Sequence, residues 1–145
     1  MNLKSLLGPL VGGKPGAASH MRNLIEMAAA DGQFQDSEKQ LLKKIASRYG
    51  ISDGQLASIQ SNPGKVEFEV PKDARQKFHQ LYDLVNMMGI DNHIHENEVG
   101  LADLLAIKFG YKREIAHELV QVIRENIKNG SNVDETMKRA QLMIA

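Results

Sequence analysis

The sequence predicts an all-α protein: a single-domain bundle of about seven helices built from two helix–loop–helix repeats. Apolar residues recur every three or four positions through most of the 145 residues, which is the spacing of a helix with one buried face. Residues typical of helix ends separate these stretches. Only residues 66–70, VEFEV, alternate as a strand would, and a lone segment of this kind cannot form a stable sheet.

The first half of the chain, residues 17–62, is expected to hold three helices. The second of them should stop at Gly50, because glycine readily adopts the left-handed backbone that follows a helix. The third should begin at Ser52, which can form a capping box with Gln55. The expected inward positions are Met21, Leu24, Ile25, Ala28, Leu41, Leu42, Ile45, Tyr49, Leu56 and Ile59.

The second half, residues 72–130, repeats this organisation after an extended linker, and a C-terminal helix is expected over 132–144. Pro71 to Asp73 form a helix-start signal, while Gly110 and Gly130 mark helix ends. The expected inward positions are Phe78, Leu81, Tyr82, Val85, Met88, Leu101, Leu104, Leu105, Phe109, Ile115, Leu119, Val122, Ile123 and Ile127.

Composition limits the functions open to the chain. Lys plus Arg and Asp plus Glu both number 18, so no overall charge attracts nucleic acid or an anionic membrane. There are no cysteines, which removes disulfides and thiolate metal sites and fits a cytoplasmic protein. No apolar run approaches the roughly 20 residues of a transmembrane helix. Residues 1–16 are expected to form a flexible tail rich in Gly and Pro, with a tether to a membrane or partner as the alternative.

The two halves align without a gap when the chain is shifted by sixty residues. Five pairs are identical within twenty residues, where about one is expected by chance. These pairs fall on loop residues, a helix start and a helix stop, so we expect two repeats that a pseudo-twofold axis would relate. The pairs are Asp31 with Asp91, Glu38 with Glu98, Leu41 with Leu101, Ala46 with Ala106, and Gly50 with Gly110.

The duplicated loop resembles that of a known family. In each copy a helix ends near an aspartate, Asp31 or Asp91, and a glutamate stands seven residues later, after a turn with one apolar residue. In an all-α chain of this length, the pattern resembles the TerB family of bacterial tellurite-resistance proteins over residues 17–145. The resemblance implies clustered acidic loops, a role in metal or oxyanion stress, and peripheral membrane association through partners. The second copy departs from the pattern, because Asn92 stands at the position that corresponds to Gly32 and two histidines follow.

Each loop also resembles the second half of a calcium-binding EF-hand loop. Asp31 would take the fifth position, Gly32 the sixth and Glu38 the twelfth. The first and third positions, which should supply oxygen ligands, are Met27 and Ala29. Half of the side-chain ligands are therefore missing, and calcium affinity should be millimolar or weaker. The second copy has Met87 and Gly89 at the same two positions.

A purely structural interpretation of the loops is open as well. Glu38 and Glu98 would lie in the first turn of the following helix, where a carboxylate can accept from free N–H groups, and Asp36 or Ser37 could be the cap residue. Asp31 and Asp91 fit less readily, because negative charge at a helix C-terminus is disfavoured by about 0.3–1 kcal/mol. Either N–H groups of the turn or a cation would then neutralise them.

The second loop, DNHIHENE, is the stronger candidate for a transition-metal site. His93 and His95 would face the same side of an extended segment. With Asp91, Glu96 or Glu98 beside them, they would suit zinc, nickel or copper better than calcium. The alternative is a solvated loop that holds two histidines. The other histidines, His20, His79 and His117, are expected at the surface or at the rim of the helices.

The expected function is therefore that of a non-enzymatic module. No phosphate loop, dinucleotide fingerprint, HExxH or nucleophile elbow is present in the sequence. We expect a cytoplasmic stress-response protein whose helical surface binds a partner protein and whose loops weakly hold a divalent metal ion. The alternatives are a scaffold whose loops only cap helices, and a metal-dependent enzyme. The candidate metal ligands are Asp31, Asp36, Glu38, Asp91, His93, His95, Glu96 and Glu98.

Overall fold

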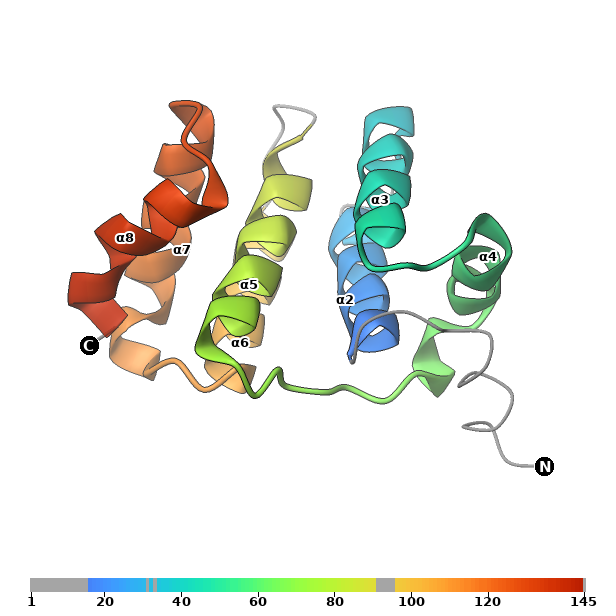
Figure 1. The fold of residues 1–145 in the computed structure, drawn as a ribbon, viewed down its shortest axis with the longest axis horizontal. Coiled ribbons are helices and arrows are strands. Elements are labelled where there is room, and N and C mark those ends of the chain that lie inside the picture. Colours follow the sequence, from blue (N-terminus) through green and yellow to red (C-terminus); the bar gives the residue numbers. More distant parts are fainter. Residues whose placement is uncertain (1–15, 31, 33, 91–95, 145) are drawn as a thin grey trace.

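The structure, a computed structural model, describes residues 16–30, 32, 34–90 and 96–144. Over these residues it is all-α, with seven α-helices and no strand, so the predicted fold class is confirmed. Figure 1 shows three neighbouring helix pairs, α2 with α3, α5 with α6 and α7 with α8, and α4 beyond α3 at one edge. The elements are α2 (Ala17–Ala29), α3 (Asp36–Arg48), α4 (Asp53–Ser61), the short 3₁₀ helix η1 (Pro63–Lys65), α5 (Ala74–Gly89), α6 (Glu96–Lys108), α7 (Arg113–Lys128) and α8 (Val133–Ile144).

α5 is the central helix of the bundle. It contacts α2, α3, α6, α7 and α8, and 8 of its 16 residues are buried. A helix with one solvent-facing side buries only a stripe, so this burial reflects neighbours on several sides. Leu104 of α6, predicted to face inward, is instead 48% exposed, because the buried stripe of α6 runs through Ala102, Leu105 and Ala106. The largest buried side chains include Phe78, Phe109, Met21, Leu24, Leu42 and Leu81.

The predicted helix ends are present. Ser52 Oγ accepts from Gln55 N at 3.2 Å, and Gln55 Oε1 accepts from Ser52 N at 2.8 Å, which completes the predicted capping box. Asp73 caps α5 by accepting from the backbone N–H of Gln76. Gly50 and Gly110 have φ of 78° and 103°, a conformation that glycine adopts without a side-chain clash.

The linker between the halves was predicted to be extended throughout, but it begins with the 3₁₀ helix η1, and only the residues after η1 run without helix to α5. This later part packs on the helices of both halves. The Arg22 side chain donates to Val66 O at 2.6 Å, and Glu69 N donates to Ser19 Oγ at 2.8 Å; both side chains belong to α2. On the other side, the Phe68 ring stacks on Phe109, with centroids 5.8 Å apart. The linker is therefore part of the folded domain.

Helix contacts in the two halves correspond under the sixty-residue shift. α2 contacts α3, α4, α5 and α6, whereas α5 contacts α6, α7, α2 and α3 in addition to α8. The contact with α8 has no counterpart in the first half. Each of the other contacts in one list maps onto a contact in the other when α2 is exchanged with α5, α3 with α6 and α4 with α7. This is the pattern that two repeats would produce, although the twofold relation itself stays a prediction. The expected tail lies outside the described residues except for Gly16, and none of the described helices is long and apolar enough to cross a bilayer.

Candidate functional site

The repeated glutamates of the two acidic loops are both buried. Glu38 is 1% exposed at the start of α3, and Glu98 is 2% exposed at the start of α6. Asp36 and Glu96, two positions earlier, are both exposed. Each half therefore has an exposed carboxylate followed, two positions later, by a buried one. The first turn of α3 and the end of α5 lie at the same side of the bundle, at the top of Figure 1.

Glu38 acts as a helix cap, as the structural interpretation predicted. Its Oε1 accepts from Gln35 N at 2.8 Å, and Gln35 is the N-cap residue of α3. The suggestion that Asp36 or Ser37 caps this helix is wrong, because both are already helical residues. Glu98 occupies the corresponding place in the first turn of α6.

The remaining predicted ligands cannot be placed together. Asp31, Asp91, His93 and His95 lie outside the described residues. Within the part of the chain that the structure describes, no three His, Asp or Glu side chains come together as a metal site would require. Of the predicted metal ligands, the structure describes Asp36, Glu38, Glu96 and Glu98.

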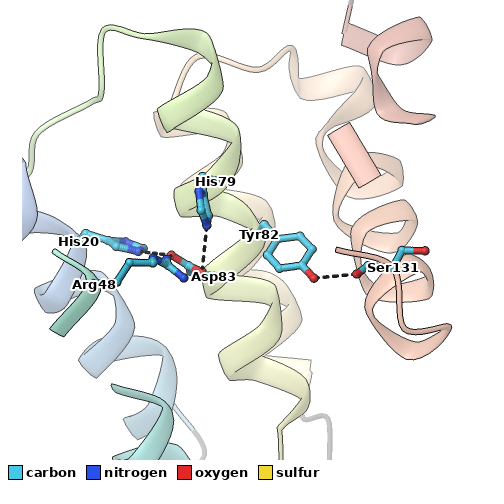
Figure 2. Close-up of polar contacts among 6 residues, drawn as sticks. All are labelled: His20, Arg48, His79, Tyr82, Asp83 and Ser131. Carbon is cyan, nitrogen blue, oxygen red and sulfur yellow. Dashed lines mark hydrogen bonds and ion pairs between the residues drawn. The ribbon is translucent and has the colours of Figure 1, made fainter. Parts of the chain in front are cut away.

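A second polar cluster lies inside the bundle, where α2, α3 and α5 meet (Figure 2). At its centre is Asp83 of α5, whose side chain is 3% exposed. His20 Nε2 of α2 lies 2.9 Å from Asp83 Oδ2, and the guanidinium of Arg48, at the end of α3, hydrogen-bonds to the same oxygen. His79, one turn before Asp83 on α5, places its Nε2 3.9 Å from Oδ1. We call His20, Arg48, His79 and Asp83 the Asp83 cluster.

Helix geometry explains how these residues come together. His79 and Asp83 are four residues apart, so they share one face of α5. Arg48 is the last residue of α3, where a cation also interacts favourably with the helix dipole. Its guanidinium carbon lies 5.5 Å from the ring centroid of Tyr49, which in turn lies 5.1 Å from the ring of His20. The cluster thus joins three helices through one carboxylate.

Burial dominates the electrostatics of the cluster. It lowers the pKa of His20 against the opposing influence of the Asp83 hydrogen bond, and the nearby Arg48 charge lowers that pKa further. Burial also lowers the pKa of His79 and raises the pKa of Tyr49. A neutral His20 that donates from Nε2 to Asp83 leaves its Nδ1 lone pair buried without a hydrogen-bond partner. At neutral pH the cluster is therefore one Arg–Asp ion pair with two neutral imidazoles.

This arrangement suits a structural role. Arg48 neutralises the Asp83 carboxylate, which both imidazoles approach, and its positive charge opposes a metal cation at the same place. The hydroxyl of Tyr82, next to Asp83 in sequence, donates to Ser131 O at 2.9 Å in the turn between α7 and α8 (Figure 2). Polar contacts from α5 therefore extend to both sides of the bundle.

The prediction that His20 lies at the surface or rim is wrong, because His20 is fully buried. His79 and His117 lie at the rim and at the surface, as expected, with side-chain exposures of 31% and 62%. The sixty-residue shift carried a signal for His20: it matches His20 with Gln80 and Asn23 with Asp83. All four side chains are buried, so each half places two polar groups at corresponding buried positions of α2 and α5.

Comparisons with protein families, with curated proteins and with solved structures find no match to this chain.

Proposed function

We propose that the protein is a non-enzymatic, TerB-like stress-response module whose acidic loops weakly bind a divalent cation and whose helical surface binds a partner protein. The observation that supports the metal half most is the matched burial of Glu38 and Glu98. These residues occupy the place of the last EF-hand ligand in each loop, and both are at most 2% exposed.

Capping alone does not require a buried carboxylate, because a capping glutamate serves equally well at a solvated helix end. Burying a carboxylate costs free energy unless hydrogen bonds or positive charge compensate. The hydrogen bond from Gln35 N, together with the further interactions of Glu38 and Glu98, supplies part of this compensation. A divalent cation held by the loop carboxylates would add to it. Because half of the EF-hand ligands are missing, the proposed affinity is weak.

The partner-binding half of the proposal rests on the rigidity of the bundle. The Asp83 cluster fixes α2, α3 and α5 relative to one another, and the Tyr82 hydrogen bond ties α5 to the turn before α8. An interaction surface benefits from such a frame, since a rigid surface loses less entropy on binding. The enzyme alternative has less support, because the buried carboxylate of Asp83 is already paired with Arg48.

Isothermal titration of the purified chain with zinc, nickel, manganese and calcium tests the metal half. We expect heat from at least one ion, loss of that heat in the Asp91→Ala/Glu98→Ala variant, and normal heat in Glu118→Ala, which removes an exposed carboxylate of α7. Equal heats in all three proteins would remove the proposed metal site.

The scaffold alternative makes a different prediction. If the loops only cap helices, Asp31→Asn and Glu98→Gln should lower the thermal midpoint while no ion raises the midpoint of the unaltered protein. If a metal binds, the same ion should raise the midpoint of the unaltered protein and fail to raise that of the variants.

A further inference from the structure

An open groove lies at the opposite end of α5 from the acidic loops. Its volume is about 470 Å³, and ten residues line it, drawn from the start of α5, the α6–α7 turn, the start of α7 and one side of α8. Figure 1 shows these segments meeting at the lower side of the bundle, near the C-terminus. We call it the α5–α8 groove; its apolar lining includes Phe78, Ile115, Met137 and Ile144.

Two lysines give the groove a positive edge. Lys77 of α5 and Lys112 of the α6–α7 turn both line it, and neither forms an ion pair with a described residue. The Lys77 ammonium lies 5.9 Å from the centroid of the Tyr111 ring, which also lines the groove. Burial raises the pKa of Tyr111 to about 12, so its hydroxyl stays protonated at neutral pH and can donate a hydrogen bond.

The size of the groove favours a small ligand over a protein. A stable protein interface uses about 20–30 residues on each side, which is two to three times the number lining this groove. The volume instead falls within the range of about 300–1,000 Å³ that holds small molecules. Apolar walls with a few polar groups at one place are the usual composition of such a site, and here the charged groups are cations.

We propose that the α5–α8 groove binds a small amphipathic carboxylate with a hydrocarbon tail. The tail packs against Phe78, Ile115 and Met137, where it leaves water. The carboxylate lies at the ammonium groups of Lys77 and Lys112, which form charge-assisted hydrogen bonds with it. This binding site is independent of the acidic loops and of any metal that they hold.

The test is calorimetric titration of the whole chain with dodecanoate, compared with dodecanol as the uncharged analogue. We expect saturable binding of dodecanoate and at least about tenfold weaker binding of dodecanol, because the alcohol lacks the charge that the lysines recognise. The Lys77→Met/Lys112→Met variant should bind dodecanoate at least about tenfold more weakly than the unaltered protein, while its affinity for dodecanol should be nearly unchanged. The matched control Lys128→Met, at the other end of α7, should bind dodecanoate normally.

Two further variants test where the tail lies. Gln141→Trp places a large ring at an exposed position of the groove lining. It should lower the affinity for both dodecanoate and dodecanol without disturbing the core. Leu142→Ser removes an apolar side chain that is 92% exposed and absent from the groove lining, so it should change neither affinity. A thermal melt of each variant confirms that it is folded.

Three results would overturn the proposal. Equal affinity for dodecanol and dodecanoate would show that the lysines do not select an anion. Equal weakening by Leu142→Ser and Gln141→Trp would indicate general adsorption to exposed apolar residues. Binding of an acidic amphipathic peptide at the groove in the absence of any dodecanoate binding would assign the groove to a protein partner.

Discussion

Replacing Arg48 with methionine tests the electrostatics of the buried cluster most directly. Arg48→Met keeps an apolar stem similar to that of arginine but removes the guanidinium charge that pairs with Asp83. The carboxylate of Asp83 is 3% exposed, so water is a poorer partner for it than the guanidinium that the substitution removes. His20 then remains as its one close hydrogen-bond partner among the described residues.

The structure brackets the size of the effect. Breaking a fully buried ion pair costs about 3–5 kcal/mol, whereas an exposed pair contributes about 0–1 kcal/mol. Here one partner is buried and the other, Arg48, is 40% exposed, which places the expected loss at about 2 kcal/mol. For a chain of this size, that loss corresponds to a fall of about 4–8 °C in the thermal midpoint.

The loss should depend on pH in a specific direction. Arg48 helps to lower the pKa of His20, so the variant should have a higher His20 pKa than the unaltered protein. At about pH 5.5 a protonated His20 can replace the lost positive charge beside Asp83, whereas at about pH 8 it cannot. The destabilisation should therefore be larger at about pH 8 and shrink on acidification.

Thermal melts followed by circular dichroism at both pH values measure this effect. Lys44→Met, one turn earlier on α3 and exposed, is the matched control and should be nearly neutral. A loss no larger than that of the control would mean that Arg48 does not stabilise Asp83. A loss that is the same at both pH values would refute the coupling between Arg48 and His20.

Three further outcomes follow from the same structure. Burial lowers the pKa of both His20 and His79 in the folded protein. The protein should therefore have its full stability above the pKa of an unfolded histidine, about 6.5, and lose stability as the pH falls below that value. Thermal melts of the His20→Gln/His79→Gln variant should show a flatter dependence of the midpoint on pH. Tyr82→Phe removes the hydrogen bond to Ser131 O and should lower the free energy of unfolding in urea by about 1 kcal/mol, with an unchanged slope. Gly50→Ala forces a side chain into a backbone with φ of 78° and should cost about 1–2 kcal/mol by the same assay, and no loss would contradict the observed turn.

The fold was predictable because its signals are local. Helical spacing of apolar residues, the Ser52–Gln55 capping box and the glycines after α3 and α6 each act within a few residues. Leu104 was misplaced because Leu104 and Leu105 both fit an apolar pattern, and only the packing of α6 against α5 and α7 decides which one is buried.

The buried cluster and the groove were much harder to predict. His20 and Asp83 are 63 residues apart, and their contact arises only when α2 and α5 pack together. Besides the sixty-residue shift, a second sequence signal was available, since His20 stands four residues before Leu24, on the apolar stripe of its helix. The groove had no such signal, because three separate helices and one turn contribute its lining. For the acidic loops, the first-turn positions of Glu38 and Glu98 were predicted correctly, but their burial required the tertiary structure.

Residues 66–70 contact helices of both halves, so the stability of each half depends on the other. α2 holds the backbone of this segment through Arg22 and Ser19, while Phe68 rests on Phe109 at the end of α6. A protease cut here would leave a nicked but associated protein, since both sides stay attached by contacts other than the severed bond. Either half produced alone would expose apolar residues that the other half normally buries, and it should be unable to fold by itself. Halves produced together should reassemble.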